Sequence, residues 1–168
     1  YQVVSERGSE YVRNKVLREM LKREQQMVAS GQASRGDLTA TNYEFSETDE
    51  SRAGEHHVLL TPKRKDVMLV HGRMVLTSDG RELLRVEGRL AKNPSFWTTQ
   101  VYVTRHYARV DGVRVPIATE SLAKIRFVGR SRLDVKYEYE SVNGQPVTTA
   151  AAHALTTGAT ASMIALPN

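Results

Sequence analysis

The chain has 168 residues, of which 40% are hydrophobic and 26% charged, and its formal net charge at pH 7 is +5. A chain of this length can bury one sizeable core, and this composition excludes disorder over most of the length. The absence of cysteine excludes disulfides, thiolate metal sites and cysteine nucleophiles. No stretch approaches the roughly 18 uncharged apolar residues that a membrane-spanning helix needs, so we expect a protein that is not transmembrane. Lysine and arginine are scattered among 19 acidic residues, which favours a generally solvated surface over a dedicated anion-binding footprint.

The N-terminal part of the chain has the pattern of a long amphipathic helix. Ser9 is a suitable N-cap, residues 10–30 have apolar side chains at i, i+4 spacing, and Gly31 can end the helix. The apolar stripe contains Val12, Val16, Leu17, Met20, Leu21 and Val28. We expect this helix, over residues 9–30, to pack against a sheet. A basic helix lying on a membrane surface is the alternative, although its apolar face has no Trp or Phe.

The rest of the chain predicts an antiparallel meander. A short strand is expected around Tyr43 and Phe45, and from His57 onward apolar residues recur with period two, interrupted by the basic loop Lys63-Arg64-Lys65. Asp79-Gly80 and Asp111-Gly112 stand between alternating runs, which is a strong hairpin signal because type I′ turns need positive φ. A further turn is expected at residues 129–131. The expected strands cover residues 67–77, 82–91, 99–109, 113–120, 122–128 and 133–142.

The alternation also predicts one apolar and one charged face for the sheet. In the last expected strand Leu133 and Val135 alternate with Asp134 and Lys136. The predicted fold is therefore α+β and mainly β, with a curved antiparallel sheet forming an open half-barrel wrapped on the long N-terminal helix. We expect one domain over residues 1–146, with its sheet over 40–142. The Ala/Thr-rich residues 147–168 are expected to be a flexible tail, with a weak terminal helix or strand as the alternative.

No constellation of residues indicates catalysis. The histidines do not have metal-binding helical spacing. Carboxylates such as Glu87 and Glu138 are expected to lie on the solvent-exposed face of a sheet. No nucleophile elbow, phosphate-cradling glycine loop or nucleotide fingerprint is present. We therefore expect no enzyme, no catalytic residue, no metal site and no cofactor.

Phe96 and Trp97, the only tryptophan, lie side by side at the end of the loop that begins at Lys92. Since adjacent residues of a strand point to opposite faces, one ring is expected to enter the core while the other lines the mouth of a cavity. The alternative is that both rings plug the end of the sheet.

From Thr61 to Gly144, about half of the chain, the sequence resembles bacterial proteins of the outer-membrane lipoprotein-sorting-like family, a subgroup whose function is largely unassigned. The phrases that carry the resemblance are Leu84–Leu90, Asn93–Trp97, Gly112–Pro116 and Tyr137–Ser141. The wider relatives are the periplasmic lipoprotein carriers LolA and LolB, and the resemblance to these is one of fold. It implies an open β-barrel around helices, an apolar cavity for acyl chains, and a periplasmic or otherwise exported protein whose signal peptide is not visible here. One departure is that a single convincing helix is present, where the carriers use several.

The sequence hypothesis is thus a non-enzymatic envelope protein that binds acyl chains of lipids or lipoproteins. The expected ligand-binding side chains of the apolar cavity are Leu84, Val86, Leu90, Phe96, Trp97, Val101, Val103, Val115, Ile117, Leu133, Val135 and Tyr137. The alternative is an interaction or sensor module that uses the half-barrel as a platform for another envelope protein. Nucleic acid is not an expected partner, because the basic elements carry no aromatic residues for stacking.

Overall fold

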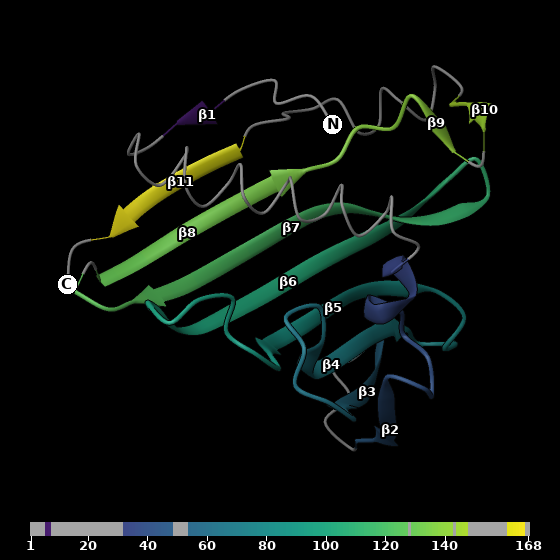
Figure 1. Cartoon of the computed structure of the whole chain (residues 1–168). Helices are drawn as coiled ribbons and strands as arrows, with labels where there is room; N and C mark the ends of the chain where they lie inside the picture. Colours follow the sequence, from purple (N-terminus) through teal and green to yellow (C-terminus); the bar gives the residue numbers. More distant parts are fainter. Residues whose placement is uncertain are drawn as a thin grey trace.

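The computed structural model describes residues 6–7, 32–48, 54–127, 129–142, 144–147 and 161–166. Its strands are β1 (Glu6–Arg7), β2 (Tyr43–Glu47), β3 (Glu55–Pro62), β4 (Val70–Thr77), β5 (Leu83–Leu90), β6 (Thr98–Val110), β7 (Val113–Ile125), β8 (Gly129–Lys136), β9 (Ser141–Val142), β10 (Gln145–Pro146) and β11 (Ala161–Leu166). Nine of them form one open sheet in the order β1-β11-β8-β7-β6-β5-β4-β3-β2, and β9 pairs with β10. The long strands β6, β7 and β8 run side by side with β11, while β2 to β4 turn away from their direction (Figure 1).

The prediction of an α+β fold with a sheet wrapped on a long N-terminal helix is wrong. Nearly all regular structure of the described residues is antiparallel sheet, and the helical element found there is the short 3-10 helix η2 (Gln32–Gly36). Residues 10–30, where the helix is predicted, lie outside the described part. The core under β2 to β5 is covered by Leu38, which follows η2, and by Leu69 from the β3–β4 loop. Two short irregular segments therefore cover apolar surface for which we expected a helix.

Within the described ranges, no helix is long and apolar enough to cross a membrane.

Both hairpins predicted from Asp-Gly turns are confirmed, with Asp79-Gly80 between β4 and β5 and Asp111-Gly112 between β6 and β7. Asp111 and Gly112 have φ angles of 47° and 81°, the left-handed pair that a type I′ turn requires. The turn predicted at residues 129–131 is wrong. These residues open β8 and pair with the end of β7, which runs unbroken where two strands were expected, so the turn lies before Gly129.

The Ala/Thr-rich segment 147–168, for which we expected a tail, contains a strand. β11 pairs antiparallel with β8, from Ser162 opposite Asp134 to Leu166 opposite Arg130. The strand alternative is therefore present over Ala161–Leu166, while residues 148–160 lie outside the described part. Since β11 covers the backbone of β8 on that side, β8 is an internal strand.

One face of the sheet, here called the inner face, carries the apolar core. The pairing places Leu60, Gly72, Gly88, Val103, Ser121 and Leu133 in one row across β3 to β8. The buried cluster at one end of this face consists of Tyr43, Leu60, Leu69, Val70 and Val86. The buried Tyr43 hydroxyl accepts a hydrogen bond from the Val70 N–H at 3.0 Å, so its polar atom is satisfied. The opposite, outer face carries charged residues such as Arg73 and Asp134, as predicted, but on β3 and β4 it also carries the buried His57 and Val75.

Two glycines let the sheet bend between β4 and β5. Gly72 and Gly88 are directly paired. A Cβ atom on Gly72 would overlap the backbone oxygen of Glu87 and lie 2.6 Å from the Cα of Gly88, and a Cβ on Gly88 would lie 2.6 Å from the Cα of Gly72. Each missing side chain would thus point at the other backbone. The two strands approach so closely on the inner face that only glycine fits there.

Candidate functional site

The side chains predicted to form an apolar cavity divide by exposure. Val86, Val101, Val103, Val115 and Leu133 are buried. Leu84, Leu90, Ile117, Val135 and Tyr137 are half-buried, whereas Phe96 and Trp97 are exposed. Val86, Val103 and Leu133 lie on the inner face as expected from their alternation. Whether any of these side chains contacts an acyl chain stays a prediction.

A bulge in β7 divides the apolar residues of that strand. The register shifts between His106 and Tyr107, so that Ala118 pairs with His106 while Pro116 pairs with Tyr107. Ile117 falls in this irregularity. Beyond it, the inner-face positions of β7 are Thr119, Ser121 and Ala123, which are small. The apolar run Val113–Ile117 therefore does not continue along the inner face.

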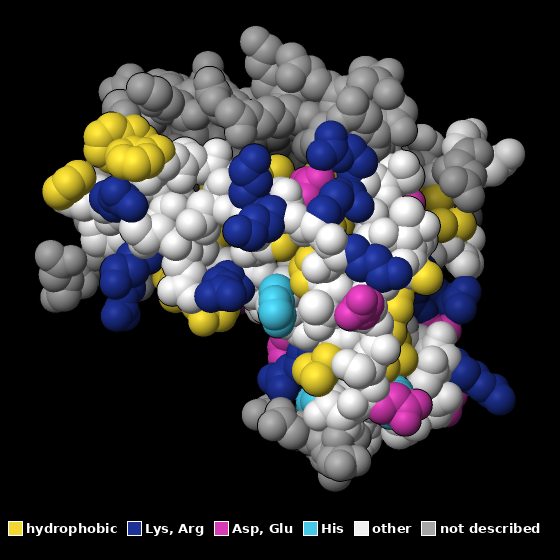
Figure 2. All heavy atoms as spheres, turned by 60° about the horizontal axis from the view of Figure 1, so that its bottom comes forward, with side chains coloured by type: hydrophobic (Ala, Val, Ile, Leu, Met, Phe, Trp, Pro, Cys, Tyr) yellow, Lys and Arg dark blue, Asp and Glu magenta, His cyan; other side chains and the backbone are white. Residues whose placement is uncertain are grey.

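The two aromatic residues of the β5–β6 loop lie on the surface. Phe96 is 72% exposed and Trp97 is 57% exposed. The expectation that one ring enters the core, and the alternative that both plug the sheet end, are both wrong. The space-filling view shows hydrophobic side chains gathered at the molecular surface beside Lys and Arg side chains (Figure 2).

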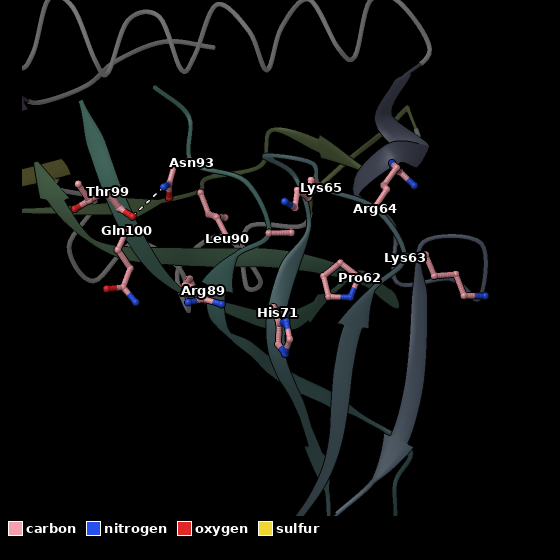
Figure 3. Close-up of a pocket in the computed structure, with 11 residues that line it drawn as sticks. Pro62, Lys63, Arg64, Lys65, His71, Arg89, Leu90, Asn93, Thr99 and Gln100 are labelled. Atoms are coloured by element: carbon pink, nitrogen blue, oxygen red, sulfur yellow. Dashed lines mark hydrogen bonds between the residues drawn. The ribbon is translucent and has the colours of Figure 1, made fainter. Parts of the chain in front are cut away.

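A pocket of about 590 Å³ lies at the end of the sheet where β3 and β5 finish and β4 and β6 begin. It is lined by Pro62, Lys63, Arg64, Lys65, His71, Arg89, Leu90, Ala91, Asn93, Thr99 and Gln100 (Figure 3). Only Leu90 was among the side chains predicted for a cavity. The lining contains four Lys or Arg side chains, one His and no carboxylate. The pocket is therefore suited to an anion rather than to an apolar chain alone.

Two of the four cationic side chains make hydrogen bonds within the protein. Lys63 Nζ donates to the backbone oxygen of Ala40 at 2.7 Å. Arg64 donates to the side-chain oxygen of Asn42 at 2.5 Å and to the backbone oxygen of Arg35 at 2.7 Å. These bonds tie the basic loop to η2 and to the segment after it, and Lys63 extends away from Arg89 in the close-up (Figure 3).

Lys65 and Arg89 are the cations left for a ligand. Among the described residues neither makes a side-chain hydrogen bond or ion pair, and both are exposed. Arg89 pairs across the sheet with His71, and the two side chains extend to the same side of the strands as Gln100 (Figure 3). A guanidinium with open donors binds phosphate or carboxylate in a two-point fork. Asn93, which donates to the backbone oxygen of Thr99 at 2.9 Å, holds the β5–β6 loop beside them.

Asp66 fixes the shape of the basic loop through the hydrogen bonds that its carboxylate accepts. Its buried carboxylate accepts hydrogen bonds from Arg35 at 2.7 Å, from the Met68 N–H at 3.0 Å and from Arg64 at 3.4 Å. Burial alone would raise the pKa of Asp66, but the hydrogen bonds from Met68 and Arg35 outweigh it and hold that pKa below its ordinary value. The charged form of Asp66 is thus the one that the folded loop requires.

The outer face carries a second charged cluster that adjoins the pocket, since Arg73 and Glu87 lie two residues along β4 and β5 from His71 and Arg89. Arg85 donates to both carboxylate oxygens of Glu55, at 2.7 and 3.0 Å, and to Glu87 at 3.0 Å. Glu87 also accepts from Arg73 at 2.6 Å, and the buried His57 donates Nε2–H to Glu55 at 3.0 Å. Each carboxylate here has a cationic partner, so the cluster is a cross-strand support with no unpaired charge to offer a ligand.

This cluster makes the fold sensitive to acid. The hydrogen bonds from Arg85, and then from His57, lower the pKa of Glu55 from 4.5 to about 2. Because the folded pKa lies below the unfolded one, the stabilisation is complete above pH 4.5 and is lost as the pH falls toward 2. We expect the Glu55→Gln variant to lose less stability than the wild type over this pH range, as measured by urea unfolding.

Glu44→Gln on β2 is the matched control, since Glu44 is exposed and makes no ion pair with a described residue. Its stability should fall with pH in parallel with the wild type. An acid profile of Glu55→Gln that follows the wild type equally closely would contradict the ascribed role of the Arg85 pair.

Nothing in the described ranges points to a metal centre, since no group of three or more His, Asp or Glu side chains lies close enough to hold an ion. Among the lining residues, His71 and Arg89 were not expected in a binding site. Their pairing depends on a register shift between Val75 and Leu76, which the Asp79-Gly80 hairpin alone does not predict. Comparisons of this chain with protein families, with curated proteins and with solved structures find no match.

Proposed function

We propose that this protein binds, without chemical conversion, amphiphiles that carry a phosphate or carboxylate head group. The observation that supports this most is the pocket lining, which contains no carboxylate and combines His71 with Lys65 and Arg89, two cations that pair with no described residue. An anion there gains charge-assisted hydrogen bonds, and the neighbouring Glu87 is paired with Arg73 and Arg85. The pocket therefore favours an anionic head over a zwitterionic or neutral one.

The apolar part of the ligand has contacts in the same pocket. Pro62, Leu90 and Ala91 belong to the lining. Leu90 and Ala91 also pack against the buried cluster, so the head-group site adjoins apolar surface. Each methylene group buried there contributes about 0.8 kcal/mol, which separates a lipid from a bare phosphate ion. The proposed ligand is therefore a lipid whose head group binds at the sheet end.

The test is calorimetric titration with lysophosphatidate, lysophosphatidylcholine and inorganic phosphate. We expect lysophosphatidate to bind most tightly, and Arg89→Ala to weaken it about tenfold or more, which corresponds to loss of a charge-assisted pair. Arg81→Ala is the matched control, because Arg81 is an exposed arginine of the β4–β5 turn outside the pocket.

Equal affinities of Arg89→Ala and Arg81→Ala for lysophosphatidate would overturn the assignment of the pocket. Phosphate binding as tight as that of lysophosphatidate would retain an anion site but refute the amphiphile. The other hypothesis, a platform for a second envelope protein, stays a prediction. The open edge at β2, where Glu44 to Glu47 are exposed, is the place at which a partner strand could pair.

A further inference from the structure

Three aromatic side chains form an exposed group at the same end of the sheet, here called the aromatic tip: Phe96, Trp97 and Phe127. Phe96 and Trp97 come from the β5–β6 loop and Phe127 from the β7–β8 turn. Their ring centroids lie 5.6 Å apart for Phe96 and Trp97, and 6.3 Å apart for Trp97 and Phe127. The exposed fractions are 72%, 57% and 94%, so the rings touch one another but are not covered by the protein.

The backbone holds these rings outward. The Arg126 N–H donates to the backbone oxygen of Trp97 at 2.8 Å, which joins the loop to the turn. Phe127 has a φ of 64°, in the left-handed region that bulky residues rarely adopt. Burial of the Phe127 ring does not compensate for this backbone strain. We therefore infer that the exposed ring interacts with something outside the folded chain.

The chain segments around the aromatic tip carry basic residues and no acidic ones. Residues 91–105 and 121–133 contain no Asp or Glu. Around the aromatic tip they supply four exposed cations, here called the cationic rim: Lys92, Lys124, Arg126 and Arg130. Lys124 and Arg130 are paired across β7 and β8, and the Arg126 guanidinium lies 4.5 Å from the centre of the Phe96 ring. Hydrophobic and cationic side chains are visible next to each other at the upper left of Figure 2.

This combination matches the boundary of an anionic bilayer. Trp and Phe rings favour the region between head groups and acyl chains, and Lys and Arg near them attract anionic lipid phosphates. A single-stranded nucleic acid would instead need ring faces set apart for base stacking. Here the rings meet edge to face, and Arg126 covers the Phe96 ring.

We propose that the aromatic tip docks this protein onto a bilayer that contains anionic phospholipid. Phe96, Trp97 and Phe127 enter the interfacial layer, and the cationic rim contacts lipid phosphates. The proposal does not rest on the pocket function. It places the pocket residues Asn93, Thr99 and Gln100, which belong to the same loop and strand, next to the membrane surface.

The experiment is sedimentation of the full chain with vesicles of phosphatidylcholine alone or of equal parts phosphatidylcholine and phosphatidylglycerol. We expect partition onto the anionic vesicles to be at least about tenfold stronger, and to fall when salt is raised to about 0.5 M. Trp97, as the only tryptophan, reports its own insertion through a blue shift of its emission with anionic vesicles.

The double variant Phe96→Ala/Phe127→Gly removes two rings and keeps the reporter. Glycine accepts the φ of 64° at position 127, so the fold is retained, which thermal unfolding verifies. We expect at least about a tenfold loss of partition. Leu59→Ala is the matched control, since Leu59 is 41% exposed on β3, outside the aromatic tip, and its partition should equal that of the wild type.

Equal partition of the double variant and the wild type would overturn the proposal, and so would equal binding to both kinds of vesicle or binding to neither. Retention on single-stranded DNA that the double variant loses, without vesicle binding, would assign the surface to nucleic acid. Arg89→Ala should dock normally, and the double variant should still bind lysophosphatidate. Failure of the docking proposal is therefore separable from failure of the proposed function.

Discussion

Replacing Gly72 with alanine is expected to destabilise the protein by about 3 kcal/mol, the upper end of the range for overpacking. The added Cβ would overlap the backbone oxygen of Glu87 and lie 2.6 Å from the Cα of Gly88. These are backbone atoms in a paired strand, so they cannot rotate away as a flexible side chain would. In a chain of this size, thermal unfolding should show a midpoint lowered by about 6 to 12 °C.

Gly80→Ala separates this steric effect from the loss of glycine as such. Gly80 has a φ of 69° and nothing within 4 Å of its missing Cβ. Its substitution should cost only about 1 kcal/mol, through the left-handed conformation. If both variants unfold at the same temperature, β4 and β5 do not approach as closely as described.

Asp66→Ala is expected to lower the unfolding free energy by about 2 to 3 kcal/mol and to weaken lysophosphatidate binding. The substitution leaves the Met68 N–H and two arginines without the carboxylate that they share. A broken buried ion pair costs about 3 to 5 kcal/mol, and we expect less because Arg35 and Arg64 are partly exposed. Affinity falls because Lys65 stands in the loop that Asp66 holds. Urea unfolding and calorimetric titration measure the two effects.

The pH dependence gives an independent check on Asp66. Its pKa in the folded protein lies below the ordinary value, so its stabilisation is present at neutral pH and declines in acid. The wild type and Asp66→Ala should therefore converge in stability as the pH is lowered. Asp79→Ala, at an exposed turn, should cost less than about 1 kcal/mol at neutral pH. A neutral-pH loss for Asp66→Ala no larger than that of Asp79→Ala would refute the anchoring role.

The strands and the Asp-Gly hairpins could be predicted because their causes are local. Asp111 and Gly112 accept the left-handed angles of a tight turn, whatever the rest of the chain does. The alternation of Leu133 and Val135 with the charged residues Asp134 and Lys136 indicates which side of that strand is buried. Both signals depend on a few neighbouring residues, so they could be read without knowledge of the fold.

The errors come from features that depend on distant strands. The turn was predicted at Gly129 because glycine usually marks turns. Pairing with Ile125 instead draws Gly129 into β8, although both Gly129 and Phe127 have positive φ angles, of 96° and 64°. The bulge near Ile117 similarly shows only in the pairing of β6 with β7. The predicted helix covered apolar surface that, under β2 to β5, is covered by Leu38 and Leu69. For the Gly129 turn and the Ile117 bulge, a longer-range contact overrode a local preference.

The sequence by itself determined most of the strands, the two Asp-Gly hairpins and the alternation of apolar and charged side chains along β8. Only the tertiary structure decided that Lys65, Arg89 and His71 line one pocket, and that Phe127 joins Phe96 and Trp97. These residues come from several loops and strands of the sheet. The order and register of the strands bring these residues to one end of the sheet. Strand order and register are properties of the whole sheet, and no local pattern encodes them.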